Sequence, residues 1–220
     1  VLMELGILPK INYGGSNDNG TSREKLPAKE FKNIRRIWVD AARELSNIGL
    51  IAPAFNDRHS YVENVDKMSR FFDQNGIRCS ADNYVPFFGV YAYLAGPDFE
   101  ELVKGRNVVA VTWLDADRKS GLEKTFKQMG AANVDFLEVS PHSAVLENID
   151  PTSLVHSPDV AIFGCGLGSA PLIAQFRDTK AVCIDAGFLL DLLANQKLRG
   201  KRAWTLPDDL YDQHTQASSL

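Results

Sequence analysis

Three glycines between a predicted strand and a predicted helix have the residue type and spacing for ligand chemistry: Gly164, Gly166 and Gly168, in the segment DVAIFGCGLGSA. Glycine lets a backbone turn tightly and approach a ligand closely, and a helix N-terminus after such a turn attracts phosphate or carboxylate. Ser169 is placed to cap that helix and to donate to the ligand. Asp185 follows Gly164 by 21 residues, at the end of the next predicted strand, which suits an acid that binds a ribose. The pattern favours an anion or nucleotide site; the alternative is a tight turn, with Asp185 as a surface acid or cap.

The same G-x-G-x-G pattern occurs in other classes of protein. Methyltransferases that use S-adenosylmethionine carry it after a strand, and dinucleotide-binding folds carry a related pattern. Both classes usually place the loop after the first strand of the domain, whereas here it lies about three quarters of the way along the chain. The position argues against both classes unless the sheet is permuted.

A pair of acids, Asp115 and Asp117, follows the apolar run 107–114. Carboxylates separated by one residue point the same way on an extended backbone and can hold Mg²⁺ or Mn²⁺ against a diphosphate. The alternative is that one of them caps the following helix, and this is the commoner role of acids in that place.

Candidates for a general base follow other predicted strands. They are Asp57 in Asn56-Asp57-Arg58, Asp82 in Ser80-Ala81-Asp82, and His142 after Ser140-Pro141. Ligands of parallel sheets bind at the carboxyl ends of the strands, so these positions are where a base is expected. The four histidines have no metal-ligand spacing, and the chain contains neither a G-x-S-x-G elbow nor a P-loop lysine motif.

Hydrophobic periodicity predicts the elements that must position these residues. Apolar runs predict strands over 50–55, 77–81, 107–114, 133–139, 160–163 and 180–184. Spacings of three and four predict helices over 31–48, 62–75, 84–105, 122–130, 170–176 and 188–196. Strands alternating with helices predict a doubly wound α/β fold, with a mostly parallel sheet covered on both faces.

The composition is that of one soluble globular domain. The 220 residues are 45% apolar and 24% charged, and the formal net charge is −4. We expect a single domain over 1–204 and a polar tail over 205–220. The acidic balance argues against nucleic-acid binding, and no apolar run approaches the ~20 residues of a membrane span. Three sparse cysteines indicate a reducing compartment, so cytoplasm is the expected location.

Several segments, taken together, resemble the GT-D type of bacterial glycosyltransferase. These segments are GILP-x-x-x-Y, Arg23 before a long helix, IGLIAPAFNDR, FEELVKGRNVVAV and the block DVAIFGCGLGSAPLIAQFRDTKAVCIDAGFLLDLL. The resemblance covers about residues 6–204. It implies a Rossmann-like enzyme that transfers a sugar from a nucleotide donor, usually a uridine diphosphate sugar, to a glycan or a protein-linked acceptor.

The resemblance also assigns site residues. Arg23, Asn56 and Arg58 match polar positions of the family pattern, with Arg58 facing the donor phosphates. The family's metal and donor motif, R-x-G-D-G-E, is not in this sequence, and the match begins just downstream of its place. Because the first residues resemble a helix already under way, we expect a preceding segment outside this sequence. Otherwise Asp115 and Asp117 would take over the divalent cation, or no metal is used.

The sequence therefore predicts a glycosyltransferase that uses a nucleotide sugar. Two alternatives stay open at this point. One is an S-adenosylmethionine-dependent methyltransferase or another nucleotide-cofactor enzyme, based on the glycine loop. The other is a non-catalytic nucleotide-binding or assembly domain that kept the fold and lost the acidic motif.

Overall fold

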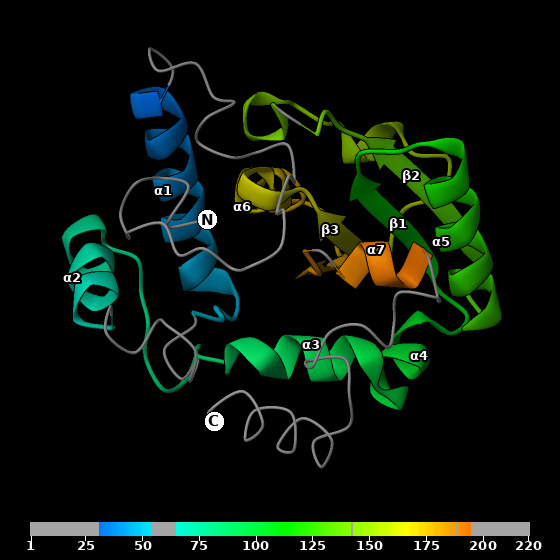
Figure 1. Cartoon of the computed structure of the whole chain (residues 1–220), viewed down its shortest axis with the longest axis horizontal. Helices are drawn as coiled ribbons and strands as arrows, with labels where there is room; N and C mark the ends of the chain where they lie inside the picture. The colour runs from blue at the N-terminus through cyan, green and yellow to red at the C-terminus, as the bar shows by residue number, and fades with distance from the viewer. Residues whose placement is uncertain (1–30, 54–64, 142, 188, 195–220) are drawn as a thin grey trace, which may run out of the picture.

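Four parallel strands form the sheet of the computed structural model, which describes residues 31–53, 65–141, 143–187 and 189–194 (Figure 1). The strands are β1 (Asn107–Thr112), β2 (Asn133–Glu138), β3 (Val160–Gly164) and β4 (Val182–Asp185), in the order β2-β1-β3-β4. All three pairings are parallel. The central strands β1 and β3 are buried on both faces, which explains their continuous apolar sequences.

Helices cover both faces of this sheet, as the alternating pattern predicts. On one face Val108 and Ala110 pack with α3 (Phe87–Ala95), α4 (Pro97–Val103), α5 (Ala116–Gln128) and α7 (Leu189–Ala194). On the other face Val109 and Val111 pack with α6 (Ser169–Ala174) and the 3₁₀ turn η3 (Ala144–Leu146). The doubly wound α/β prediction is confirmed.

The chain leaves β1 toward one edge of the sheet and β3 toward the other. From β1 it crosses through α5 to β2, and from β3 it crosses through α6 to β4. Since α5 and α6 lie on opposite faces, the winding direction reverses between β1 and β3. In open α/β sheets such a reversal opens a crevice at the carboxyl ends of the two strands, where ligands bind.

Two further helices extend the structure beside α6. Helix α1 (Phe31–Ile48) packs on the face that α6 and η3 cover. Its Ile34 contacts Val145 and Leu167 there. Helix α2 (Val65–Asn75) packs on the outer side of α1, so that α2, α1 and α6 follow one another beside the sheet (Figure 1). The buried Asn83 ties the segment after α2 to α1, because its side-chain nitrogen donates to the Ser46 carbonyl at 2.8 Å.

The predictions of strands over 50–55 and 77–81 are wrong for the residues that the structure describes there. Ile51 forms only an isolated parallel bridge with Tyr84, and no strand covers 77–81. Their apolar side chains have another purpose: Ile77 is buried and Ile51 packs beside it, against Val39 and Phe71 of the two helices. The apolar runs here reflect burial under helices and not sheet pairing.

The remaining strands fall within a few residues of their predicted bounds. The predicted helix over 84–105 divides into α3 and α4, because Gly96 breaks it and Pro97 starts the second helix at its first turn. Across the described ranges, no helix has both the length and the apolar character that crossing a lipid bilayer requires.

Candidate functional site

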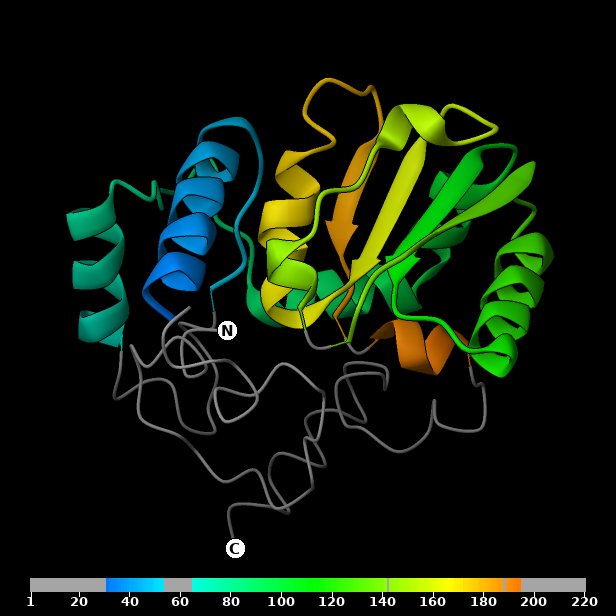
Figure 2. The ribbon, with the colours of Figure 1, turned by 90° about the horizontal axis from the view of Figure 1, so that it is seen from above.

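The carboxyl ends of β1 and β3, between which the winding direction reverses, bring two of the predicted motifs together. Thr112, the last residue of β1, pairs in register with Gly164, the last residue of β3, and its hydroxyl donates to the Gly164 carbonyl at 3.1 Å. The segment with Asp115 therefore begins beside the glycine loop. All four strands run in the same direction, so their carboxyl ends lie together at one end of the sheet, with α7 next to it (Figure 2). We take this carboxyl end of the sheet as the candidate site.

Two of the three loop glycines have a packing reason. A Cβ on Gly164 would lie 2.6 Å from Leu190 Cδ1 of α7. A Cβ on Gly168 would lie 2.6 Å from the Ala144 side chain and 2.8 Å from its backbone carbon. These glycines let α7 and η3 approach the loop, as the packing interpretation predicts.

Gly166 differs from its two neighbours because it is exposed and has a φ of +56°. This left-handed conformation favours glycine. Gly166 begins the 3₁₀ turn η5 (Gly166–Gly168), which leads into the six-residue helix α6. The exposed backbone at Gly166, and not a long helix N-terminus, is therefore the part of the loop that can meet a ligand.

Ser169 is buried and does not cap α6, whose N-cap residue is Gly168. Its hydroxyl oxygen accepts from the Cys165 N–H at 3.3 Å, and the same hydroxyl hydrogen-bonds the carboxylate of Asp185. Asp185 ends β4 and also accepts from the Gly187 N–H at 3.1 Å. Asp185, the acid predicted to bind a ribose, thus lies at the same end of the sheet as the glycine turn, and Ser169 connects the two.

The acid pair after β1 begins α5. Asp115 is the N-cap of this helix, and its Oδ1 accepts from the Arg118 N–H at 2.7 Å. Asp117 lies exposed in the first turn. The capping interpretation is confirmed for Asp115. Within the described ranges no three His, Cys, Asp or Glu side chains gather as metal ligands.

The sequence prediction missed Arg118, a buried cation at the carboxyl end of the sheet. Its side chain is 7% exposed and forms an ion pair with Asp191 of α7. Nη2 donates to the Thr112 hydroxyl at 3.1 Å, and the guanidinium carbon lies 4.7 Å from the centre of the Trp113 ring. In the part of the chain that the structure describes, Nε has no hydrogen-bond partner. The helical spacing could have indicated that Arg118 is buried. It precedes the buried Leu122 by four residues, so both lie on the same face of the helix.

Burial is the main cause of the shifted pKa values of two groups at this end of the sheet. It lowers the pKa of Arg118 to about 10, although the nearby Asp115 opposes the shift. Burial, with a smaller contribution from the charge of Asp185, raises the pKa of the Cys165 thiol to about 12. At neutral pH the arginine is therefore a cation and the thiol is neutral.

Asp82 lies away from this site. It follows no strand, and Arg78 forms an ion pair with it at 3.0 Å in the segment after α2. The Ser80 hydroxyl donates to its carboxylate and holds the pKa of Asp82 below its usual value, with a smaller effect of Arg78. A low pKa makes a weak base, so both position and chemistry argue against the predicted role. The other predicted residues lie outside the described ranges: Arg23, Asn56, Asp57, Arg58 and His142.

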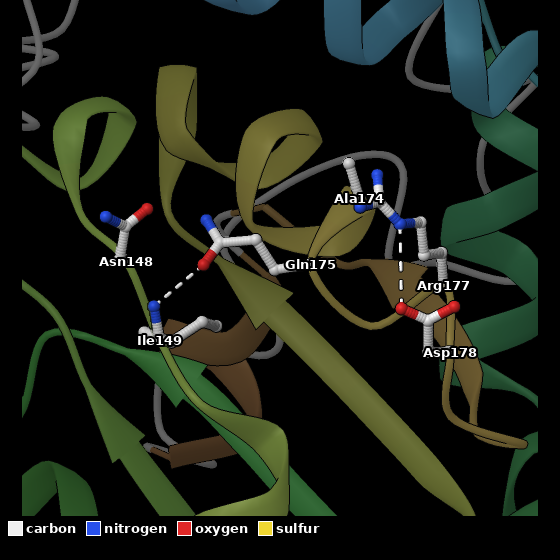
Figure 3. A pocket seen from close by; sticks show the side chains of 6 residues that line it. All are labelled: Asn148, Ile149, Ala174, Gln175, Arg177 and Asp178. Carbon is white, nitrogen blue, oxygen red and sulfur yellow. Dashed lines mark hydrogen bonds and ion pairs between the residues drawn. The ribbon is translucent and has the colours of Figure 1, made fainter.

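A hollow of about 370 Å³ lies at the opposite end of α6 from the glycine turn (Figure 3). Three of its polar side chains, those of Gln175, Arg177 and Asp178, have partners within the protein. Gln175 accepts from the Ile149 N–H at 2.8 Å and donates to the Glu147 carbonyl at 3.0 Å, and Arg177 lies 3.7 Å from Asp178. These contacts tie the loop after η3 to α6, and we assign the hollow no ligand.

Comparison of the chain with protein-family models, with curated proteins and with solved structures finds no match. The class of protein is therefore defined by the fold and the site alone. It is a doubly wound α/β domain whose polar groups gather at the reversal point of a parallel sheet.

Proposed function

We propose that the protein is a glycosyltransferase that uses a nucleotide sugar, with the donor diphosphate in the crevice between β1 and β3. The observation that carries the proposal is the exposed left-handed turn at Gly166, beside the strand end that holds Arg118. Ligands of such sheets bind at this place. The resemblance to the GT-D type supports a uridine diphosphate sugar as donor and a glycan or other glycosylated molecule as acceptor.

Sugar transfer needs stabilisation of the departing diphosphate. The Gly166 backbone is accessible to its oxygens, and the charge of Arg118 lies at the end of the neighbouring strand. Because its Nη atoms are already bound to Asp191 and Thr112 and its side chain is buried, the arginine acts on the diphosphate through its field. Asp185, at the end of β4, is placed to accept a hydrogen bond from a ribose hydroxyl.

A divalent cation, when bound, would neutralise charge on the diphosphate. Mg²⁺ in nucleotide sites is commonly held by one or two carboxylates together with substrate phosphates. Asp115 keeps one carboxylate oxygen outside its capping bond, and Asp117 is exposed in the first turn of α5. This pair fits a cation only in the presence of a bound donor. For the acceptor hydroxyl, Asp57 and His142 stay predictions as general bases.

Thermal unfolding with a panel of ligands tests the proposal on the 220-residue chain. Uridine diphosphate should raise the melting temperature by several degrees, because a ligand at 100 times its Kd stabilises by about 2.7 kcal/mol. Guanosine and thymidine diphosphates report base preference, and each nucleotide is measured with and without Mn²⁺. Stabilisation by S-adenosylhomocysteine or NAD alone would contradict a glycosyltransferase. Stabilisation by uridine diphosphate without sugar transfer would favour a non-catalytic binding domain.

A variant of the glycine turn tests where the diphosphate binds. Asparagine tolerates a left-handed backbone, so Gly166→Asn should keep the turn while its side chain blocks close approach. We expect uridine diphosphate affinity to fall at least about tenfold, or about 1.4 kcal/mol, in isothermal titration.

Gly105 offers a matched control for this variant. It has a similar φ of +71°, and a Cβ there would meet nothing within 4 Å. Gly105 precedes β1, so it lies at the amino end of the sheet, opposite the candidate site. Gly105→Asn should bind uridine diphosphate like the wild type. Equal affinity in both variants would remove the diphosphate from the Gly166 turn.

A further inference from the structure

Trp113 is a partly exposed aromatic residue directly after the carboxyl end of β1. It follows Thr112 directly, and it is 38% exposed although the five preceding residues of β1 are buried. A large apolar ring that is exposed to solvent at the carboxyl end of the sheet forgoes the stabilisation that its burial would give. The position therefore needs an explanation other than packing of the core.

The ring of Trp113 is held in place from one side. The Arg118 guanidinium lies over one face, with its carbon 4.7 Å from the ring centre. That guanidinium is itself fixed, because it binds both Thr112 and Asp191. The guanidinium lies over one face of the ring and Trp113 is 38% exposed, so a planar ligand placed over the other face would meet an oriented platform.

The platform and the glycine turn lie on adjacent strand ends. Thr112 and Gly164 form the last pair of the register, so Trp113 follows one strand end and Cys165 and Gly166 follow the adjacent one. Neighbouring strands are about 4.8 Å apart. A ligand whose phosphates meet the exposed Gly166 turn can therefore also extend a flat ring over Trp113.

We propose that the indole of Trp113 stacks against the base of the nucleotide donor, with Arg118 as the positioning residue that holds the indole. Stacking suits this place because every nucleobase has a π-face that an aromatic side chain can meet. The inference rests on the proposed function, since it assigns the base-binding part of the same donor site.

Two probes that share a diphosphate separate the base from the phosphates. Uridine diphosphate carries a base, whereas inorganic pyrophosphate does not. We expect Trp113→Ala to weaken uridine diphosphate about tenfold, which corresponds to about 1.4 kcal/mol, and to leave pyrophosphate affinity within twofold of the wild type. Trp113→Phe keeps an aromatic face and should restore most of the loss.

Matched variants control for structural effects. Trp38→Phe changes another partly buried tryptophan, on α1, and should alter neither affinity. Arg118→Lys keeps the charge but loses the planar contact with the indole. It should weaken uridine diphosphate more than pyrophosphate, which a merely structural role would not produce.

Tryptophan fluorescence gives an independent readout. The chain contains three tryptophans, Trp38, Trp113 and Trp204. Uridine diphosphate should quench the emission of the wild type and of Trp38→Phe, and the quenching should be lost in Trp113→Phe, whose fold is easier to preserve than that of the alanine variant.

The outcomes separate this inference from the function on which it rests. If the wild type binds uridine diphosphate and Trp113→Ala binds it equally well, the stacking role is wrong and the proposed donor site stands. An equal loss of uridine diphosphate and pyrophosphate in Trp113→Ala would also overturn stacking. If the wild type binds no nucleoside diphosphate, both the donor site and the stacking role are overturned.

Discussion

Replacing Arg118 by methionine should lower the free energy of unfolding by about 3 kcal/mol, because removal of one partner of a buried ion pair leaves the other uncompensated. Here the Asp191 carboxylate loses its partner and the Thr112 hydroxyl loses a donor. Asp191 is 38% exposed, so water recovers part of the cost and the value falls at the lower end of the usual range. Urea unfolding measures the change as a shift of midpoint at constant slope.

A double variant and an exposed control sharpen this prediction. Arg118→Met combined with Asp191→Leu should cost clearly less than the sum of the two single changes, since two apolar partners leave no unpaired charge. Arg36 forms an ion pair with Asp40 at the surface, where it is 67% exposed. Arg36→Met should therefore cost below about 1 kcal/mol. Equal costs for Arg118→Met and Arg36→Met would mean that the buried pair does not hold α7 to the strand end.

Replacing Gly121 by alanine should also destabilise the protein, by about 2 to 3 kcal/mol, since overpacking of tight contacts costs that much and a backbone cannot rotate away. An alanine Cβ at this position of α5 would lie 2.0 Å from the carbonyl oxygen of Ala194 and 2.9 Å from its carbonyl carbon. Helix α7 must then move, and with it the buried Leu190 and Leu193. The melting temperature should fall by several degrees in a calorimetric scan.

Gly89 provides the matched control, because it too lies inside a helix. Its Cβ would come no closer than 3.4 Å, to Val85 Cγ1, which is ordinary van der Waals contact. Alanine has the higher helix propensity, by up to about 1 kcal/mol. Gly89→Ala should therefore be neutral or stabilising. A Gly121→Ala variant as stable as the wild type would show that α5 and α7 do not approach this closely.

An apolar run in the sequence predicts a strand correctly only where the buried segment also pairs with a neighbouring strand. The runs at β1 and β3 are apolar because both faces of a central parallel strand are covered. The segments around Ile51 and Ile77 also carry buried apolar residues, but these side chains pack between α1 and α2. A short apolar run records only that a segment is buried, and what buries it is decided by elements distant in the sequence.

The location of the candidate site follows from the sequence, whereas its contacts do not. Gly166, Asp115 and Asp185 lie at the strand ends, where the alternation of strands and helices places them. The buried role of Arg118 was missed because a charged residue in an amphipathic helix is usually assigned to solvent. Asp82 was misplaced because its prediction depended on a strand that does not form.

The strand order has a consequence for how the protein is made. Contacts at the start of β1 span 26 residues to β2 and 52 residues to the segment that begins β3. A ribosome that adds about 5 to 20 residues per second therefore exposes β1 and β2 before β3 emerges. During that interval the apolar inner edge of β1 has no neighbour, which is the state in which nascent sheets associate with other chains. Because β3 both covers this edge of β1 and supplies the second strand end of the candidate site, a small molecule bound there would favour the completed sheet over the chain that has only β1 and β2.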